Sequence, residues 1–243
     1  MNYELFTFDT PSALAEDVGC RLTRRVRAAA ERGESFRLAL SGGRIANDLF
    51  RALAAKASEE GVQDAWRGVE LFWADERCVP PDHPDSNYRA ASELFLVPMG
   101  IPARRVHRLE GELEPAEAAR RASAVLRAGV SGNGDELPGL DLILLGMGED
   151  GHIASLFPGA DLAVVASRAP FLDVVGPKPP PRRVTMSYPQ LAVGAAVWVL
   201  VSGSGKEIAL RNSLHGGAIT PLGTLLQTKF CTIFVSVGCE ERV

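Results

Sequence analysis

Apolar residues recur along this chain with two different spacings. Every fourth residue is apolar from Leu14 to Val26, after the capping pair Thr10-Pro11, which is typical of a helix with one buried face. Short apolar runs elsewhere are typical of buried strands. The pattern predicts strands at 36–40, 69–73, 140–145, 171–175, 183–187, 197–201 and 231–237, and helices at 11–26, 45–53, 86–95, 115–128 and 206–214. Because strands and helices alternate along most of the chain, we expect an α/β fold with a doubly wound, mostly parallel sheet and helices on both faces.

The sequence gives no sign of a boundary between domains. It contains no internal repeat and no linker long enough to separate two independent units, although 131–139 is a glycine-rich connector. Three consecutive prolines at 179–181 favour an extended, rigid loop between two of the predicted strands. We therefore expect residues 1–243 to form a single α/β domain.

The segment 143–158 carries the most informative chemistry. An apolar strand ends at Leu145 and runs into a glycine-rich turn that delivers Glu149, Asp150 and His152. We expect a short apolar helix immediately after this turn. A histidine beside two carboxylates at the end of a buried strand is suited to general base catalysis, because its ordinary pKa lies near physiological pH. The alternative is a histidine with only a structural role in the turn.

Three other predicted strands end in polar or glycine-rich sequence. Because ligands of parallel sheets bind beyond the carboxyl ends of the strands, we expect these ends to meet the histidine turn at one cleft. Small residues at a helix start expose backbone amides to an anion, and an arginine can grip phosphate or carboxylate with two hydrogen bonds. The alternatives are an ordinary tight turn, a solvated charge cluster and a lysine that faces water. The candidate binding residues are Ser41, Gly42, Gly43, Arg44, Arg77, Gly148 and Lys206, and Asp75 joins His152 and Asp150 as a candidate catalytic residue.

Two nucleotide-site patterns are present only in part. The glycines at 146, 148 and 151 match the dinucleotide spacing G-x-G-x-x-G, but Pro158-Gly159 would stop the long helix that such a site requires. Gly205-Lys206 resembles the end of an ATP-binding loop, but Leu200 stands where that loop needs its first glycine, and Glu207 follows the lysine. We expect no nucleotide cofactor.

Composition excludes several further classes of function. The formal net charge is −4, which gives no reason to expect a nucleic-acid or membrane partner. The four cysteines and four histidines lack the spacing of a disulfide framework or a metal site, so we expect no metal and a reducing, cytoplasmic compartment. No signal peptide and no apolar run of about 18 residues is seen. The expected ligand is a small phosphorylated substrate that undergoes proton-transfer chemistry.

Several segments resemble the 6-phosphogluconolactonase family. The resemblance covers roughly residues 10–215 and rests on 73–80, 86–87, 146–158, 178–181 and 205–206. It implies a fold similar to the glucosamine-6-phosphate deaminase and ribose-5-phosphate isomerase group, with some added strands. It also implies hydrolysis of 6-phosphoglucono-1,5-lactone in the pentose phosphate pathway, without a cofactor. This chain departs from the family pattern at Arg44-Ile45-Ala46, where Ser-Thr-Pro is usual, at Ile153, and in its C-terminal residues 234–243.

The resemblance and the residues together suggest a division of labour. His152 would deprotonate the attacking water, and backbone amides near Gly148 or the Arg77 guanidinium would stabilise the oxyanion. Lys206, Arg44 and the amides of 41–43 would hold the phosphate, with Arg77 as a further candidate. The two aspartates, Asp75 and Asp150, would orient the base or bind sugar hydroxyls.

Two other functions are consistent with parts of this pattern. A glucosamine-6-phosphate deaminase would share the fold and the histidine turn, but its usual glutamate is absent from 155–158, and Arg77 stands in place of its usual tyrosine. A non-catalytic phosphosugar sensor in a regulator would need a DNA-binding segment, and the sequence has neither a recognisable helix-turn-helix nor a basic excess.

Overall fold

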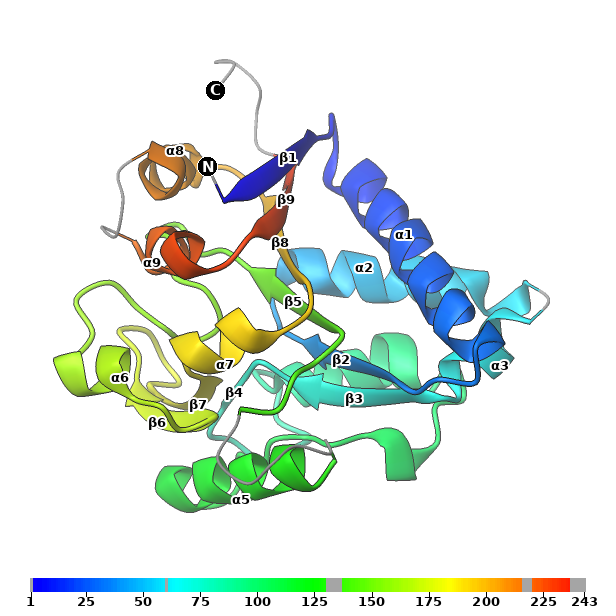
Figure 1. Cartoon of the computed structure of the whole chain (residues 1–243), viewed down its shortest axis with the longest axis horizontal. Helices are drawn as coiled ribbons and strands as arrows, with labels where there is room; N and C mark the ends of the chain where they lie inside the picture. Colours follow the sequence, from blue (N-terminus) through cyan, green and yellow to red (C-terminus); the bar gives the residue numbers. More distant parts are fainter. Residues whose placement is uncertain (1, 60, 130–136, 216–219, 237–243) are drawn as a thin grey trace.

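The computed structural model describes residues 2–59, 61–129, 137–215 and 220–236. In this part of the chain the central sheet has six strands, and every neighbouring pair is parallel, in the order β1-β9-β8-β5-β2-β3 (Figure 1). The strands are β1 Tyr3–Thr7, β2 Phe36–Leu40, β3 Val69–Trp73, β5 Leu142–Gly146, β8 Val197–Ser202 and β9 Cys231–Ser236. The predicted mostly parallel sheet is confirmed.

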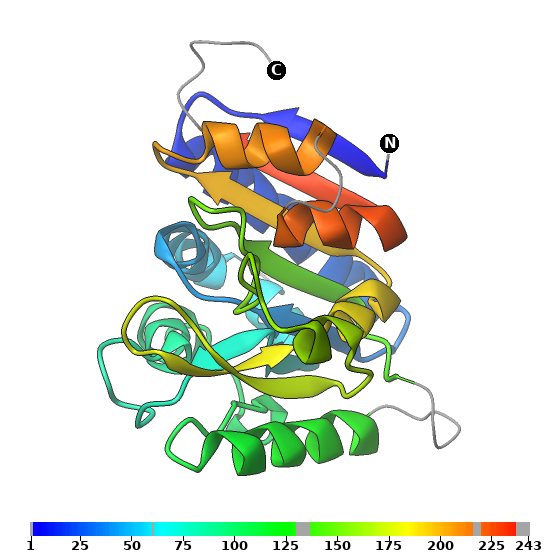
Figure 2. The ribbon, with the colours of Figure 1, turned by 90° about the vertical axis from the view of Figure 1, so that its left-hand side faces the viewer.

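Helices cover both faces of this sheet. Figure 2 shows α7, α8 and α9 on the near side of the sheet and α1 on the far side, where α1 packs against α2. The helices are α1 Pro11–Glu31, α2 Arg44–Ala55, α3 Val62–Trp66, α4 Asn87–Ala91, α5 Pro115–Ala128, α6 Leu162–Ala166, α7 Tyr188–Val193, α8 Glu207–His215 and α9 Pro221–Thr228. Shorter turns are η1 Lys56–Ser58, η2 Ser92–Leu96 and η3 Ala103–Arg105. The doubly wound arrangement follows from burial on both sides of the central strands.

The first helix shows how local sequence produces these elements. The Thr10 hydroxyl accepts a hydrogen bond from the Ala13 amide at 3.1 Å, and Pro11 occupies the first helical turn, where its missing N–H costs nothing. The residues at the predicted four-residue spacing, from Leu14 to Val26, are all buried. The predicted cap and the predicted buried face are therefore both confirmed.

A second, smaller sheet is antiparallel and has the order β4-β7-β6. Its strands are β4 Asp75–Arg77, β6 Phe171–Val175 and β7 Arg182–Met186. It continues directly from the large sheet, because only Ala74 separates β3 from β4. The Ala74 amide donates to Leu40 in the large sheet, and its carbonyl accepts from Met186 in the small one, both at 2.7 Å. The charged segment after β3 is thus a strand, and the two sheets meet beside it.

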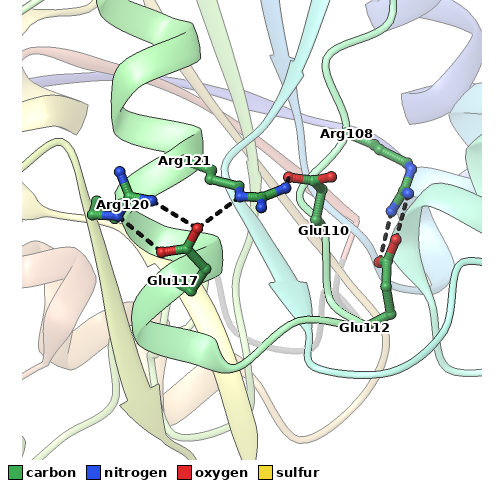
Figure 3. Close-up of polar contacts among 6 residues, drawn as sticks. All are labelled: Arg108, Glu110, Glu112, Glu117, Arg120 and Arg121. Atoms are coloured by element: carbon green, nitrogen blue, oxygen red, sulfur yellow. Dashed lines mark hydrogen bonds and ion pairs between the residues drawn. The ribbon is translucent and has the colours of Figure 1, made fainter.

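Helix α5 packs on β6 and β7, and a group of exposed ion pairs ties its surface to the preceding segment 108–112 (Figure 3). Glu117 accepts hydrogen bonds from Arg120 and Arg121 at 2.7 Å, and Arg121 also lies 3.4 Å from Glu110. These contacts are called the α5 ion-pair network below.

The structure corrects one prediction and adds elements that the pattern does not predict. The short helix expected immediately after His152 is absent, because Ala154 has a left-handed φ of 47° and the segment forms isolated bridges and turns before α6 begins at Leu162. The added elements include β1, whose sequence mixes polar and apolar residues, and the short helices α3, α7 and α9. The predictions for 131–136 and 237, and the divergent end at 237–243, lie outside the described residues. The expectation of a single domain stays a prediction.

Candidate functional site

The carboxyl ends of β2, β5 and β8 and one edge of the small sheet surround a cavity of about 120 Å³. Every candidate residue from the sequence lines it except Asp150. The lining residues are Ser41, Gly42, Gly43, Arg44, Ile45, Asp75, Arg77, Asn87, Gly146, Met147, Gly148, His152, Ala154, Arg183, Ser202 and Lys206. The parallel sheet therefore brings together segments that lie far apart in the sequence, and this space is called the site cavity below.

A tight turn after β5 holds His152 at the site cavity. The Gly148 amide donates to the His152 carbonyl at 2.8 Å, which closes the turn. A Cβ at residue 148 would lie 2.1 Å from the imidazole ring, so only glycine fits beside the histidine. The Phe157 ring, which follows the turn in the chain, packs against the imidazole, and the two ring centroids are 4.8 Å apart.

Asp150 contacts the histidine from outside the cavity lining. Its Oδ1 lies 2.5 Å from His152 Nδ1 and also accepts the His152 backbone N–H at 3.1 Å. Partial burial opposes ionisation of this carboxyl, but the hydrogen bond from the His152 amide and the imidazole outweigh it and lower the pKa of Asp150. An ionised Asp150 holds the proton of a neutral imidazole on Nδ1, and Nε2 is then free to accept a proton.

Asp75 is buried and links two segments of the site. Its two carboxylate oxygens accept the hydroxyls of Ser41 and Ser155, each at 2.8 Å. Ser41 belongs to the loop after β2, and Ser155 follows the histidine turn. The structure therefore gives Asp75 serine partners on both oxygens, which fixes the two loops relative to each other.

Two cations approach the site cavity from the large sheet. Arg44 is the first residue of α2, whose N-terminus has no side-chain cap, so its first amides remain available to a ligand. The Arg44 guanidinium reaches to within 3.4 Å of where a Cβ at residue 203 would lie, in the loop that ends at Lys206. Burial and the nearby Arg44 lower the pKa of Lys206, although Glu149 opposes this. A bound anion would relieve the repulsion between the two cations.

Glu76 links β4 to the start of α4. It is almost fully buried, and it accepts backbone N–H groups of Arg77, Asn87 and Tyr88 at 2.8 Å and the Ser86 hydroxyl at 3.0 Å. Burial raises the pKa of Glu76, although these hydrogen bonds oppose it. These hydrogen bonds attach the segment at the start of α4 to β4.

The hydrogen bonds of Glu76 hold Asn87 at the site cavity. The Asn87 side-chain amide donates to the Asp75 carbonyl at 3.0 Å. A Cβ at residue 42 would lie 1.8 Å from Asn87 Oδ1, which explains the glycine there. Ser86 also caps α4 by accepting from the Arg89 amide at 3.1 Å.

Three polar residues that line the site cavity, Asn87, Ser202 and Arg183, are not among the candidates predicted from the sequence. Asn87 belongs to the segment 86–87 that carries the family resemblance, but the sequence does not predict that it lines the site. Arg183 lies in a predicted strand, and its place in the site depends on pairing with β4, which local sequence does not show. An arginine inside a predicted strand is the sequence signal for this residue.

Two absences concern the described residues alone. Within 2–59, 61–129, 137–215 and 220–236, no three histidine, cysteine or acidic side chains are grouped so that they could hold a metal ion. No helix in the same ranges is long and apolar enough to cross a membrane.

Comparison with known proteins identifies the family. The family described as glucosamine-6-phosphate isomerases/6-phosphogluconolactonase matches residues 9–233, so the chain belongs to it. A protein of Mycobacterium tuberculosis named 6-phosphogluconolactonase is 36% identical over 224 residues, which cover 89% of this chain and 87% of that protein. A rice protein named probable 6-phosphogluconolactonase 3, chloroplastic, is 37% identical over 86% of this chain, and the match spans 65% of the rice protein's length. The resemblance noted from the sequence is confirmed.

Solved structures agree on the fold. The 6-phosphogluconolactonase of Thermotoga maritima has a TM-score of 0.79 at 24% identity, covering 96% of this chain and 98% of that one. A monomeric glucosamine-6-phosphate deaminase has a TM-score of 0.80 at 18% identity, covering 96% of both chains. The expected similarity to the fold of the deaminases is confirmed. Because both names occur on this fold, the choice between the two activities depends on the site.

Proposed function

We propose that this chain is a 6-phosphogluconolactonase, which hydrolyses 6-phosphoglucono-1,5-lactone to 6-phosphogluconate in the pentose phosphate pathway. The names of its relatives support the substrate, and the site cavity supports the chemistry. One observation carries the proposal: His152, paired with Asp150 at 2.5 Å, lines the same small cavity as Arg44, Arg77 and Lys206. A base and several cations at one cavity suit a phosphorylated substrate whose reaction begins with proton abstraction.

His152 is the proposed general base. The Nδ1–H of the neutral ring donates a hydrogen bond to Asp150, and Nε2 accepts a proton from water. The resulting hydroxide attacks the lactone carbonyl carbon and forms a tetrahedral oxyanion. The ester bond to the ring oxygen then breaks, and the departing alkoxide takes the proton back from the imidazolium. Asp150 stabilises the imidazolium between these steps.

The phosphate is proposed to bind at the start of α2. Amides of Ser41, Gly42 and Gly43, together with the helix N-terminus, favour an anion there, and Arg44 and Lys206 supply two charged donors. Asp75 contributes indirectly by holding the Ser41 hydroxyl at 2.8 Å. In this chain the guanidinium of Arg44 takes the place of the hydroxyl that the family usually has at this position, and we expect it to strengthen the electrostatic attraction.

The test is a rate measurement with freshly prepared 6-phosphogluconolactone in a pH-stat or stopped-flow instrument. The lactone also opens spontaneously, so the expected result is acceleration above that background. Unphosphorylated gluconolactone should be a poor substrate, and activity should survive exhaustive chelation with EDTA. Release of ammonia from glucosamine 6-phosphate without lactone hydrolysis would assign the deaminase activity instead, and binding of phosphosugars without turnover would assign a sensor. A cytoplasmic location stays a prediction.

A further inference from the structure

Two arginines face each other across the small sheet. The antiparallel register of β4 and β7 places Arg77 directly opposite Arg183. Side chains at directly opposed positions have Cβ atoms about 4.5–5.5 Å apart, and like charges there are destabilising. Asp75, two residues before Arg77, lies on the same face of β4 and also lines the site cavity. The Arg77–Arg183 pair is therefore an unfavourable arrangement built into the wall of the site.

Neither arginine has an acidic partner in the described part of the chain. The guanidinium of Arg77 donates to the Asp85 carbonyl at 2.6 Å, and that of Arg183 donates to the Pro180 and Lys178 carbonyls at 3.2 and 3.4 Å. The nearby carboxylate of Asp75 already accepts two serine hydroxyls. Neutral carbonyls orient the pair without cancelling its charge.

Burial makes this arrangement more costly. Arg183 is only 7% exposed, and Arg77 Nε is a buried donor without a hydrogen-bond partner in the described structure. Burial, followed by the charge of Arg77, lowers the pKa of Arg183, although Asp75 and other acids oppose this. Arg183 also lies 5.6 Å from the centroid of the Phe157 ring, but a buried cation normally has an anionic partner, so a pair that lacks a carboxylate and lines a cavity is suited to receive an anion from outside.

The cations of the site form two groups that come from different sheets. Arg44 begins α2 after β2, Lys206 lies just before α8 after β8, and the charge of Arg44 acts on Lys206. Arg77 and Arg183 belong to the small sheet, and the charge of Arg77 acts on Arg183. His152 lines the same cavity as both groups. A substrate with a single phosphate needs only one of these groups, so the second group requires its own anion.

We propose that the Arg77–Arg183 pair binds the carbonyl end of the substrate, as the oxyanion during hydrolysis and as the carboxylate of the product, while Arg44 and Lys206 bind the phosphate. This division rests on the proposed lactonase function, whose product carries both a phosphate and a carboxylate. The negative charge forms on the carbonyl oxygen when water adds, so a preorganised pair of guanidinium groups stabilises it where it develops. Arg183 becomes a specificity-determining residue of the site.

Calorimetric titration of the full chain with two ligands tests this division. The first ligand is 6-phosphogluconate, and the second is glucitol 6-phosphate, which has the same phosphate and a hydroxymethyl group in place of the carboxylate. The wild type should bind 6-phosphogluconate about ten- to a hundredfold more tightly, as expected for charge-assisted hydrogen bonds. Arg183→Met should abolish this preference and leave the affinity for glucitol 6-phosphate unchanged, whereas Lys206→Ala should weaken both ligands alike.

Arg182→Met is the matched control. Arg182 is the neighbour of Arg183 on the same strand, but it is exposed, pairs with Glu114 and does not line the site cavity. This variant should keep the full preference for 6-phosphogluconate. If Arg183→Met does not fold, as judged by circular dichroism, Arg77→Met is measured by the same criteria, because Arg77 is less deeply buried.

Each contrary outcome has a distinct meaning. Equal affinity of the wild type for both ligands would overturn the division while leaving lactone hydrolysis intact. An equal loss of both ligands in Arg183→Met would assign the pair to the phosphate and also overturn it. If the wild type binds neither phosphosugar, the proposed lactonase function fails, and the division fails with it.

Discussion

The arginines of α5 and the arginines of the site cavity stand in opposite electrostatic settings. In the α5 ion-pair network, Arg120 and Arg121 share Glu117, and Arg121 also reaches Glu110 (Figure 3). These partners are three or four residues apart on one helix, or lie in the segment just before it. In the site cavity, Arg77 and Arg183 come from separate strands and have no carboxylate within ion-pair distance in the described residues.

The pKa shifts follow the same contrast. Arg121 donates hydrogen bonds to Glu117, and Arg108 donates to Glu112; these bonds raise the pKa of both arginines, because each carboxylate stabilises the charged form. Burial and a neighbouring cation instead lower the pKa of Arg183 and of Lys206. Arg120 and Arg121 of the α5 ion-pair network therefore have carboxylate partners, whereas Arg77 and Arg183 at the site cavity have none among the described residues. An abundance of arginine therefore indicates nothing about function until the partners are known.

The largest expected effect separates the base from all these cations. His152→Gln keeps a polar side chain but cannot accept a proton, so kcat should fall by about 10²- to 10⁴-fold while binding of 6-phosphogluconate persists. Steady-state kinetics and calorimetry on the same preparation check the loss of rate and the retained binding.

His107→Gln is the control for that variant. His107 lies 2.7 Å from Glu70, stacks on Phe72 and does not line the site cavity, so its replacement should leave kcat nearly unchanged. A folded His152→Gln protein with near-normal kcat would show that His152 has only a structural role in its turn.

The next effect compares the two charged regions directly. Lys206→Ala removes a charge-assisted contact to the phosphate, so kcat/KM for the phosphorylated lactone should fall about ten- to a hundredfold. Arg121→Ala removes an arginine that is already neutralised at the α5 surface and should leave kcat/KM unchanged. Hydrolysis of unphosphorylated gluconolactone should not respond to either change. The contrast fails if both variants lose phosphorylated-substrate activity to the same extent.

A pH titration should sharpen the contrast further. Because the pKa of Lys206 lies below 10.5 in the free protein, this ammonium loses its proton at a lower pH than an exposed lysine does. Phosphate monoesters, with a second pKa of about 6, are already dianionic in that range. The affinity for glucitol 6-phosphate should therefore begin to fall at a lower pH than the ordinary pKa of a lysine would predict, by no more than the loss in Lys206→Ala. Lys206→Arg should remove the fall, because a guanidinium stays protonated; an unchanged profile would contradict the role of Lys206.

The two regions also differ in how far the sequence predicts them. Strands such as β5 are buried on both faces, so their continuous apolar runs could be recognised, and their carboxyl ends were expected to meet. Arg183 could not be placed, because its position depends on antiparallel pairing with β4, three residues that resemble a solvated turn. The α5 pairs could have been predicted from spacing alone, since Glu117 precedes Arg120 and Arg121 by three and four residues. Long-range pairing, which local sequence does not specify, decides which cations remain unpaired.

The smallest expected effect concerns the α5 ion-pair network itself. Glu117→Gln removes the carboxylate that Arg120 and Arg121 share, yet the melting temperature and kcat/KM should hardly change. The three side chains are 35%, 71% and 50% exposed, so water and salt screen their attraction, and Arg121 keeps Glu110. Ser123→Ala on the same helix is the comparison, because the buried Ser123 hydroxyl accepts the Phe171 amide at 3.2 Å. Loss of that acceptor should lower the free energy of unfolding by about 1–3 kcal/mol. Thermal and urea unfolding of both variants measure the difference. If Glu117→Gln destabilises the protein as much as Ser123→Ala does, the network is a structural element, and the exposed pairs of this chain matter as much as its unpaired cations.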